Sequence, residues 1–333
     1  MSSGIVLAVD GGNSKTDLAL VSAEGHALAL RRGPRSSPQY LGVDGCLDVL
    51  EGLLEEALRD AALADGREAP VAQVAELLMA GVDFRSDEDE LQAAAARRGW
   101  AHRIVVENDT FAVLRAGTDR GWGIAVVCGS GINCVGVSPD GRHARFPSLG
   151  AITGDWGGGY DVGLAGVVAA ARSEDGRGPR TSLEQAVPAH FGLSTPQELA
   201  EAIHRGRVAQ SRIIELAPVV IAEAERDPVA GRIVERLASE IVTLASVALR
   251  RLELEEPVEV LVGGGLVQAG DGRLVDAVRM GLVEADLRLT VRATSSAPIV
   301  GAALLGLDEL GASEEAKSRA AGELAAAAGV RSA

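Results

Sequence analysis

The sequence predicts an α/β protein built from two domains, and two observations support this. A meander of three short apolar segments opens the chain within residues 5–31, and a second such meander occupies residues 123–146. Each has a glycine-rich turn after its first strand and is followed by segments with helical spacing of apolar residues. Two halves with the same order of elements indicate a duplicated core with a ligand cleft between them.

The first half is predicted to alternate strands and helices after its meander. A Rossmann domain would instead place a helix directly after the first glycine-rich turn. The expected strands are Ile5–Val9, Thr16–Val21, His26–Arg31, Val74–Met79 and Arg103–Val106, and the expected helices are Asp44–Leu63, Asp87–Arg98 (with Ser86 as N-cap) and Asp109–Ala116.

The second half repeats the meander and then becomes mostly helical. The expected strands are Gly123–Cys128, Asn133–Val137, Ala144–Phe146 and Val258–Val262, and the expected helical stretches are Gly159 to about Leu252, Leu274–Glu284, Pro298–Leu307 and Ser313–Ala328. A long apolar stripe between Ala230 and Ala248 fits either a core or an interface between subunits.

Composition excludes several classes of partner. The net charge is -15 and no basic stripe interrupts it, so we expect neither nucleic-acid nor membrane binding. Lys15 and Lys317 are the only lysines, so an anionic ligand would depend on backbone N–H groups, helix N-termini and a metal. Three cysteines without a Cys-x-x-Cys spacing, and no predicted signal peptide, indicate a reducing, cytoplasmic location.

Three glycine-rich turns are candidate nucleotide contacts. Glycines let backbone N–H groups approach phosphate oxygens closely, and the first two turns occupy equivalent positions in the two halves. A plain hairpin or strand–helix turn is the competing interpretation for each. The candidates are Gly11, Gly12, Asn13, Ser14, Lys15 and Thr16, then Gly129, Ser130 and Gly131, then Gly263, Gly264 and Gly265.

Three aspartates are candidates for the chemistry of the site. Asp10 follows the first strand and could hold Mg²⁺ through water. Asp109 follows a strand and begins a helix, so it is either a helix cap or a general base for a hydroxyl nucleophile, with Glu107 as a competitor. Asp155 lies among four glycines, in either a flexible loop or a segment that contacts a ligand.

These motifs, in this order, resemble those of the N-acetylglucosamine kinase family, within the BadF/BadG-type branch of the sugar kinase and actin superfamily. The resemblance covers Val9 to about Gly306. It implies two actin-like (ribonuclease H-like) domains with a βββαβαβα-type core: residues 1–118 plus about 297–333, and residues 119–296 with a helical insertion. It also implies ATP and Mg²⁺ in an interdomain cleft, transfer of phosphate to the 6-hydroxyl of an amino sugar, and a homodimer.

The resemblance also implies residue roles. Asp109 would be the catalytic base, Asp10 would hold the metal, and the acceptor sugar would meet a set of polar and loop residues from both halves. That set is Ser37, Gln39, Asp109, Ser130, Asn133, Ser148, Leu149, Gly150 and Asp155. No asparagine is present in Ser36–Tyr40, where the family's kinases often have one, so the identity of the sugar stays open.

Two other functions are compatible with the same motifs. The branch includes ATP-driven activators of 2-hydroxyacyl-CoA dehydratases, which share an iron–sulfur cluster between subunits. Cys128 and Cys134 flank the second glycine-rich turn, but they are expected to be buried strand residues. A non-catalytic sugar sensor is the other alternative, and it would need no general base.

Overall fold

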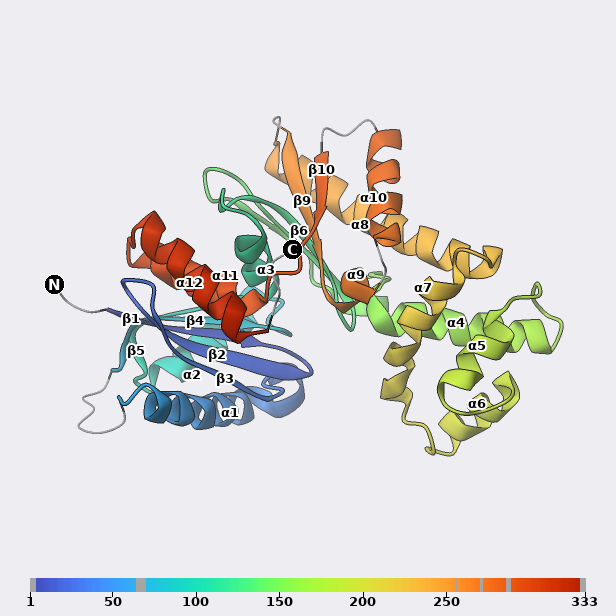
Figure 1. Ribbon diagram of the computed structural model, residues 1–333, viewed down its shortest axis with the longest axis horizontal. Helices are drawn as coiled ribbons and strands as arrows, with labels where there is room; N and C mark the ends of the chain where they lie inside the picture. The colour runs from blue at the N-terminus through green and yellow to red at the C-terminus, as the bar shows by residue number, and fades with distance from the viewer. Residues whose placement is uncertain (1–3, 64–69, 255–256, 270–271, 286–288, 330–333) are drawn as a thin grey trace. The chain divides into compact units, whose positions relative to one another are not determined.

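The computed structural model describes residues 4–63, 70–254, 257–269, 272–285 and 289–329. They divide into two compact units (Figure 1). The N-terminal unit comprises the described residues of Met1–Trp122 and Ser295–Ala333, and the central unit comprises those of Gly123–Thr294. Within the described residues, no helix is both long and apolar enough to cross a membrane.

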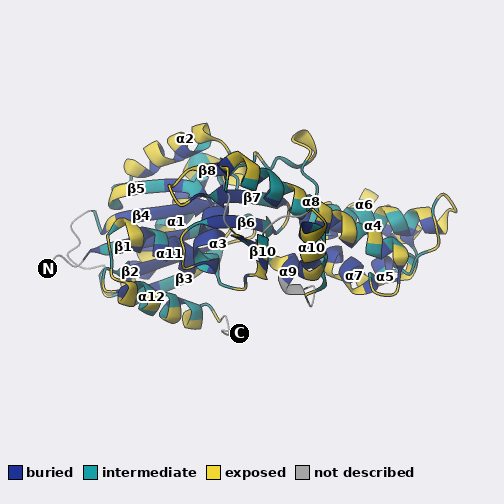
Figure 2. Ribbon diagram, turned by 90° about the horizontal axis from the view of Figure 1, so that it is seen from above, coloured by how far each residue is buried: buried dark blue, intermediate teal, exposed yellow. Residues whose placement is uncertain are grey.

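The N-terminal unit is built on a five-stranded sheet of order β3-β2-β1-β4-β5. Its first three strands are antiparallel, and β4 and β5 are parallel to β1. The strands are β1 (Ile5–Gly11), β2 (Lys15–Ser22), β3 (Ala27–Pro34), β4 (Ala72–Met79) and β5 (Ala101–Asn108). Figure 2 draws β1 and β4 in the colour of buried residues, as expected for apolar strands covered on both faces.

Helices cover both faces of this sheet. On one face, α1 packs against β2 and β3, and α2 packs against β5 and α1. On the other face, α11 packs against β1, β4 and α3, and α12 packs on α11 and β3 (Figure 1). The helices are α1 (Pro38–Asp60), α2 (Arg85–Ala96), α3 (Thr110–Gly117), α11 (Pro298–Glu309) and α12 (Glu314–Ala327).

Two helix starts differ from the sequence-based expectation. α1 begins at Pro38 rather than Asp44, because proline suits a first helical turn, and the helix continues across a kink at Gly42, whose φ is 68°. The prediction of Ser86 as N-cap of α2 is wrong, since Phe84 occupies that position. The carboxylate of Asp87 instead accepts hydrogen bonds from the backbone, at 2.9 Å from the Phe84 nitrogen.

The central unit repeats the same topology. Its sheet has the order β10-β9-β6-β7-β8, with β6 and β7 antiparallel and β9 parallel to β6, which matches the first sheet strand for strand. The duplicated core is therefore confirmed. The strands are β6 (Gly123–Cys128), β7 (Ile132–Val137), β8 (His143–Arg145), β9 (Val258–Gly263) and β10 (Leu289–Ala293).

Helices fill the rest of the central unit. The longest, α8 (Pro228–Leu252), packs against β6, β7 and β8, and most of its apolar stripe is buried there, so the stripe is largely core. The helical insertion contains α4 (Gly158–Glu174), α5 (Leu183–His190), α6 (Pro196–His204), α7 (Ala217–Glu223) and two 3₁₀ turns at Gly150–Ile152 and Gln210–Leu216. The helices α9 (Gly265–Ala269) and α10 (Arg273–Glu284) follow β9.

Candidate active site

Three parallel strands of the N-terminal unit end at one edge of the sheet. The register pairs Gly11 of β1 with Met79 of β4, and Met79 with Asn108 of β5. The first glycine-rich turn, the loop after β4 and Asp109 therefore leave the sheet side by side. In open α/β sheets this carboxyl edge is where ligands bind.

Asp109 lies directly after β5 at the N-cap position of α3, but its side chain makes no capping hydrogen bond. The capping interpretation is therefore not what the structure shows. Burial raises the pKa of Asp109 to about 6, although the backbone N–H groups of Thr110 and of Asp109 itself lower it in part. A carboxyl group with this pKa is mostly ionised at neutral pH and remains a useful proton acceptor.

Asp10, at the end of β1, carries the most perturbed carboxyl group of this edge. Burial is the main cause that raises its pKa to about 8, and the negative charges of Asp109 and Asp17 add to it. Lys15 and Arg32 lower the pKa by less. The neighbouring carboxylates therefore raise the pKa of Asp10 by more than the neighbouring cations lower it. A cation bound there would relieve the repulsion between the carboxylates.

The residues at this edge fit a magnesium ion held mainly by water and phosphate. Asp10 supplies a hard oxygen ligand in a region of excess negative charge. Among the residues that the structure describes, no three His, Cys, Asp or Glu side chains converge as a metal cage. Mg²⁺ in phosphate-transferring sites is commonly bound by one or two carboxylates together with substrate phosphates, so the arrangement suits that ion.

The first glycine-rich turn presents backbone N–H groups to a ligand. The Gly12 nitrogen donates to the Lys15 carbonyl oxygen at 2.9 Å, which closes the turn. Within the described chain, the N–H groups of Asn13 and Ser14 have no hydrogen-bond acceptor. A Cβ atom at Gly12 would lie 2.8 Å from the Lys15 carbonyl oxygen, so glycine is required. Two free N–H groups at one tip are what a phosphate oxygen needs.

Thr16 supports the turn rather than facing a ligand. Its side chain is fully buried, and its hydroxyl oxygen lies 2.7 Å from both the Pro34 carbonyl oxygen and the Ser36 hydroxyl oxygen. Since a hydroxyl has one proton, Thr16 donates to Pro34 and accepts from Ser36. Lys15 is exposed, with its ammonium group 3.7 Å from the Asp17 carboxylate.

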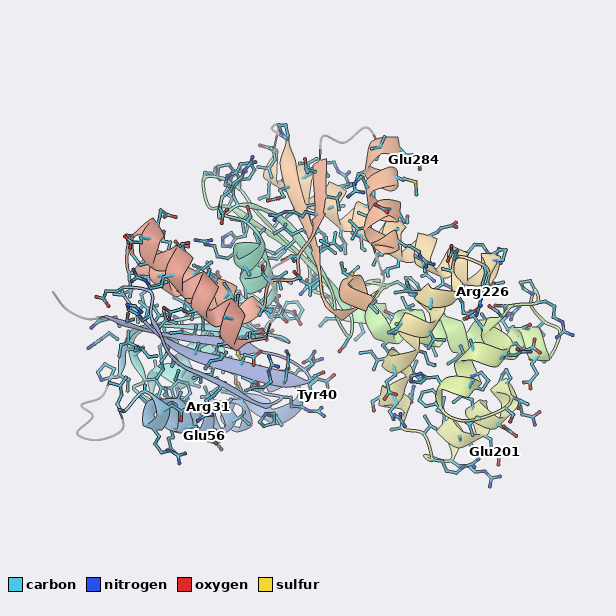
Figure 3. The ribbon with its side chains drawn as sticks, viewed as in Figure 1. Arg31, Tyr40, Glu56, Glu201, Arg226 and Glu284 are labelled. Atoms are coloured by element: carbon cyan, nitrogen blue, oxygen red, sulfur yellow. The ribbon has the colours of Figure 1, made fainter. Side chains whose placement is uncertain are left out.

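The segment that includes Ser37 and Gln39 meets the loop after β4. Gly81 has a φ of 78°, and a Cβ atom there would lie 2.8 Å from the Ser37 hydroxyl oxygen and 3.0 Å from the Gln39 Cβ atom. Ser37 is fully buried, and its hydroxyl has no partner among the described residues. Gln39 and Tyr40 are exposed, and Tyr40 stands at the surface in Figure 3. A buried hydroxyl without a partner, next to the loop after β4, is a candidate contact for a ligand hydroxyl.

Asn108 is a residue of this edge to which sequence reasoning gave no role of its own. It is 3% exposed, and its side-chain nitrogen donates to the Val82 carbonyl oxygen at 3.2 Å and to the Asp83 carboxylate at 3.0 Å. Its side-chain oxygen accepts from the Thr110 nitrogen and hydroxyl, at 3.1 and 2.7 Å. Asn108 thus ties the loop after β4 to the first turn of α3, next to Asp109. Its position between the predicted strand Arg103–Val106 and the predicted helix Asp109–Ala116 was the available signal.

The second glycine-rich turn, Gly129–Gly131, joins β6 and β7 of the central unit. The Gly129 nitrogen donates to the Gly131 carbonyl oxygen at 3.0 Å. The carbonyl oxygens of Gly129 and Ser130 accept from the nitrogens of Gly159 and Tyr160 at 2.8 and 3.0 Å. The start of α4 therefore covers the carbonyl side of the turn, while the N–H groups of Ser130 and Gly131 find no acceptor in the described chain.

The glycines around Asp155 have a packing explanation. Gly158 has a φ of 75°, and a Cβ atom there would lie 2.2 Å from the Gly131 carbonyl oxygen. At Gly157 a Cβ atom would lie 3.0 Å from the Ile132 side chain. The loop before α4 is therefore packed directly on the second glycine-rich turn.

We expect Gly158→Ala to lower the free energy of unfolding by about 2–4 kcal/mol, because it adds both backbone strain and a collision with a backbone oxygen. Gly129→Ala is the matched control, since a Cβ atom there meets nothing within 4 Å. Thermal denaturation of both variants makes the comparison. Equal unfolding temperatures for the two would contradict the packing of α4 on the turn.

Hydrogen bonds within the loop before α4 connect the candidate sugar-contacting residues of the central unit. The Asp155 nitrogen donates to the Gly150 carbonyl oxygen at 3.0 Å, and the Asp155 carboxylate accepts from the Thr153 hydroxyl. The Leu149 nitrogen donates to the same hydroxyl oxygen at 2.9 Å, and Ser148 before it has a φ of 52°. The structure thus brings Ser148, Leu149, Gly150 and Asp155 together.

Asn133 lies in β7. Its side-chain oxygen lies 2.7 Å from the Cys134 nitrogen, which donates to it. Its backbone pairs with Val127 of β6.

The third glycine-rich turn brings two strand ends together. Gly264 has a φ of 99°, and a Cβ atom there would lie 2.3 Å from the Cys128 carbonyl oxygen at the end of β6. A Cβ atom at Gly265 would meet nothing within 4 Å. The glycine at position 264 is therefore required by the protein's own backbone, and open space begins one residue later, at the start of α9.

The three cysteines, Cys46, Cys128 and Cys134, are free thiols inside the protein. Burial raises the pKa of Cys46 and Cys128 to about 12 and raises that of Cys134 further. The expectation that Cys128 and Cys134 are buried strand residues is confirmed. A buried thiol with a raised pKa is a poor thiolate ligand for a metal cluster.

Comparisons with known proteins agree with the fold. The chain is 29% identical over 276 residues to an N-acetylmuramic acid/N-acetylglucosamine kinase of Clostridium acetobutylicum, covering 82% of this chain and 89% of the relative. It is 26% identical over 321 residues to an N-acetyl-D-glucosamine kinase of Dictyostelium discoideum, covering 92% and 99% of the two chains.

A solved structure from Chromobacterium violaceum, described as a candidate N-acetylglucosamine kinase, superposes with a TM-score of 0.71 at 26% identity. The superposition covers 92% of this chain and all of the other. The model of the BadF/BadG/BcrA/BcrD ATPase family matches residues 7–306, which include all three glycine-rich turns and every candidate aspartate. The chain therefore belongs to the BadF/BadG/BcrA/BcrD ATPase family.

Proposed function

We propose that this protein is an ATP-dependent kinase that phosphorylates the 6-hydroxyl group of an amino sugar, with N-acetylglucosamine as the first candidate. The observation that carries the proposal is the shared sheet edge at which a turn with free N–H groups, Asp10 and Asp109 lie side by side. The relatives named for kinases of N-acetylglucosamine and N-acetylmuramic acid support the choice of substrate.

In the proposed reaction the acceptor hydroxyl attacks the γ-phosphorus of ATP. The new oxygen–phosphorus bond forms as the bond to the β–γ bridging oxygen breaks, and ADP leaves. Asp109 accepts the proton of the hydroxyl, and the free N–H groups of both glycine-rich turns bind phosphate oxygens. Mg²⁺, when bound beside Asp10, would neutralise phosphate charge. Asn108 keeps the start of α3 in place, so that Asp109 faces the acceptor.

Two features are proposed as acceptor contacts. They are the unpartnered hydroxyl of Ser37 and the carboxylate of Asp155, which accepts from Thr153 in its own loop. We further propose that the enzyme is a cytoplasmic homodimer. The three unpaired cysteines and the use of ATP support the location.

The function is tested by an assay of ADP release with a panel of acceptors. The panel contains N-acetylglucosamine, glucosamine, N-acetylmuramic acid, N-acetylmannosamine and glucose, each with Mg²⁺ and ATP. We expect kcat/KM to be highest for an N-acetylated amino sugar, and mass spectrometry or NMR of the product identifies the phosphorylated hydroxyl. Sugar binding without ADP release from any acceptor would indicate a sensor and overturn the proposal.

Asp155→Ala is expected to raise the KM for the sugar by about 10–100-fold, because a carboxylate that accepts sugar hydroxyls contributes one or two charge-assisted hydrogen bonds. The KM for ATP should change far less. Asp140→Ala, in the turn between β7 and β8, is the control. An unchanged sugar KM in the Asp155 variant would remove this loop from the acceptor site.

A further inference from the structure

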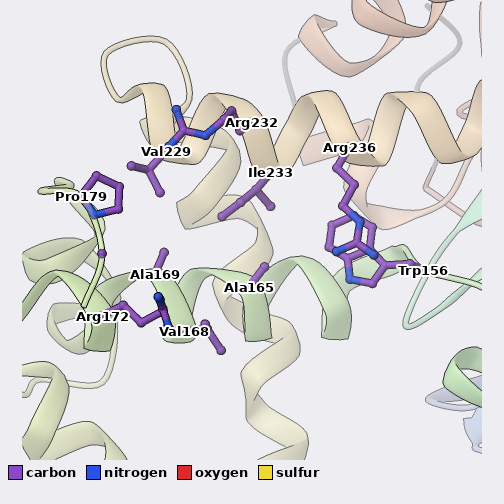
Figure 4. A pocket seen from close by; sticks show the side chains of 11 residues that line it. Trp156, Ala165, Val168, Ala169, Arg172, Pro179, Val229, Arg232, Ile233 and Arg236 are labelled. Carbon is purple, nitrogen blue, oxygen red and sulfur yellow. The ribbon is translucent and has the colours of Figure 1, made fainter. Parts of the chain in front are cut away.

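The central unit contains a groove between α4 and α8 that the proposed reaction does not use. Figure 4 shows small and branched apolar side chains of both helices facing each other across it, among them Ala165, Ala169 and Ile233. The cavity has a volume of about 300 Å³. This size is at the lower end of the range for small-molecule sites, and apolar walls with a few polar groups are typical of such sites.

Three arginines, Arg172 of α4 and Arg232 and Arg236 of α8, line this groove, and none of its lining residues is acidic. The chain has a net charge of -15, so this cluster is a local patch of positive charge on an otherwise negatively charged protein. Arg172 donates to the Arg177 carbonyl oxygen at 2.8 Å, and Arg232 makes no ion pair with a described residue. Guanidinium groups beside an apolar wall favour a ligand that carries a negative charge.

Arg236 is held in place by an aromatic ring. Its guanidinium carbon lies 3.9 Å from the centre of the Trp156 ring, and its nearest carboxylate contact is Glu240 at 4.0 Å. Stacking of this kind orients the guanidinium plane while its N–H edge remains available. Trp156 directly follows Asp155, so one wall of the groove is continuous with the loop that holds that carboxylate.

We propose that this groove is a binding site for a small organic anion, a phosphate or carboxylate joined to an apolar group. The apolar part packs between α4 and α8, and the anionic group is bound by Arg232 and Arg236. Because Arg236 stacks on Trp156, a ligand in the groove shifts the position of the neighbouring loop that carries Asp155. If the proposed kinase function holds, the ligand therefore acts on the KM for the sugar from outside the reaction site.

Calorimetric titration with phenyl phosphate tests the binding. Two comparison ligands carry one feature each: inorganic phosphate has the anionic group alone, and benzyl alcohol has the apolar ring without the charge. We expect phenyl phosphate to bind at least about tenfold more tightly than either probe, because it combines both features of the groove. Saturating Mg·ATP should leave this binding in place, since the groove is not the nucleotide site. Phenyl phosphate that binds no better than inorganic phosphate, or that Mg·ATP displaces, would overturn the proposal.

Arg232→Gln provides the matched variant, because Arg232 has no part in the proposed chemistry. It should weaken phenyl phosphate binding by about tenfold or more, as expected for loss of a charge-assisted hydrogen bond. Turnover without the probe should equal that of the wild type. Arg180→Gln, which exchanges an exposed arginine paired with Glu184, is the control. Equal affinities in the Arg232 variant and the control would refute the assignment.

A variant of the apolar wall distinguishes a ligand site from a subunit contact. Val168→Glu places a charge on this wall and should abolish phenyl phosphate binding without changing the sedimentation coefficient. If it instead converts a dimer to a monomer, the groove is a subunit contact and the proposal is wrong. Binding is measured without the sugar, so it can succeed even if the kinase function fails, and the reverse also holds.

Discussion

Asp109→Asn is expected to lower kcat by about 10²–10⁴-fold, the range for loss of a general base, while the fold and the binding of both substrates are kept. The amide has the size of the carboxyl group, and the native side chain makes no capping hydrogen bond whose loss would destabilise α3. The coupled ADP-release assay with saturating sugar and ATP measures the effect.

Glu107→Gln serves as the matched control, because Glu107 lies two residues earlier in β5 and was the competing candidate. We expect its kcat to remain within a few-fold of the wild type. Near-normal turnover in the Asp109 variant, or an equal loss in both variants, would remove Asp109 from the role of base.

The pH dependence of the wild-type enzyme follows from the same carboxyl group. A base acts only when ionised, and burial raises the pKa of Asp109 to about 6, so kcat/KM should fall as the pH drops below about 6. The residual activity of Asp109→Asn should lack this acidic limb, and Glu107→Gln should keep it. An acidic limb that persists in the Asp109 variant would mean that another group controls it.

Asp10→Asn is expected to have the second largest effect on turnover. Replacing the carboxylate with an amide weakens a hard-cation ligand, so we expect kcat/KM to fall by about 10–100-fold and the Mg²⁺ concentration for half-maximal activity to rise. The pKa of Asp10 is raised to about 8 in the metal-free protein, so proton and Mg²⁺ compete for it. Apparent Mg²⁺ affinity of the wild type should therefore increase with pH up to about 8, and that of the variant should not.

The same substitution should stabilise the metal-free protein at neutral and alkaline pH. The pKa of Asp10 rises from 3.8 to about 8 on folding, so its stabilising contribution is complete below pH 3.8 and is lost as the pH rises through 8. Asn cannot ionise and avoids that loss. We expect Asp10→Asn to exceed the wild type by about 2–4 kcal/mol in the free energy of unfolding at pH 8, and to match it near pH 4.

Chemical denaturation in EDTA at the two pH values measures this difference. Asp89→Asn, an exposed position in α2, is the control and should leave stability unchanged at both pH values. An Asp10 variant that is less stable than the wild type at pH 8 would show that the carboxylate is favourably paired in the fold, contrary to the raised pKa.

The sequence predicted the elements whose patterns are local. The two meanders, the glycine-rich turns after their first strands and the helical stretch from Gly159 all appear in the structure. The sequence analysis missed β10. Val291 is its one buried residue, and so short an edge strand shows no recognisable alternation of apolar and polar residues. The Ser86 cap failed because α2 begins earlier, at Arg85, which places Ser86 inside the first turn, while the Asp87 carboxylate accepts from the nitrogens of Asp83 and Phe84.

The sequence by itself determined the class of the molecule: a duplicated α/β core, turns that expose backbone N–H groups, and an aspartate after each of two buried strands. Only the tertiary structure decided which of these residues meet. The parallel register sets Gly11 and Asn108 at one edge, and the shared burial of Asp10 and Asp109 raises both pKa values. It also decided that Gly158 and Gly264 are required by close backbone contacts. The physical reason is that register, burial and close approach depend on residues far apart in the chain, whereas turns and periodicity do not.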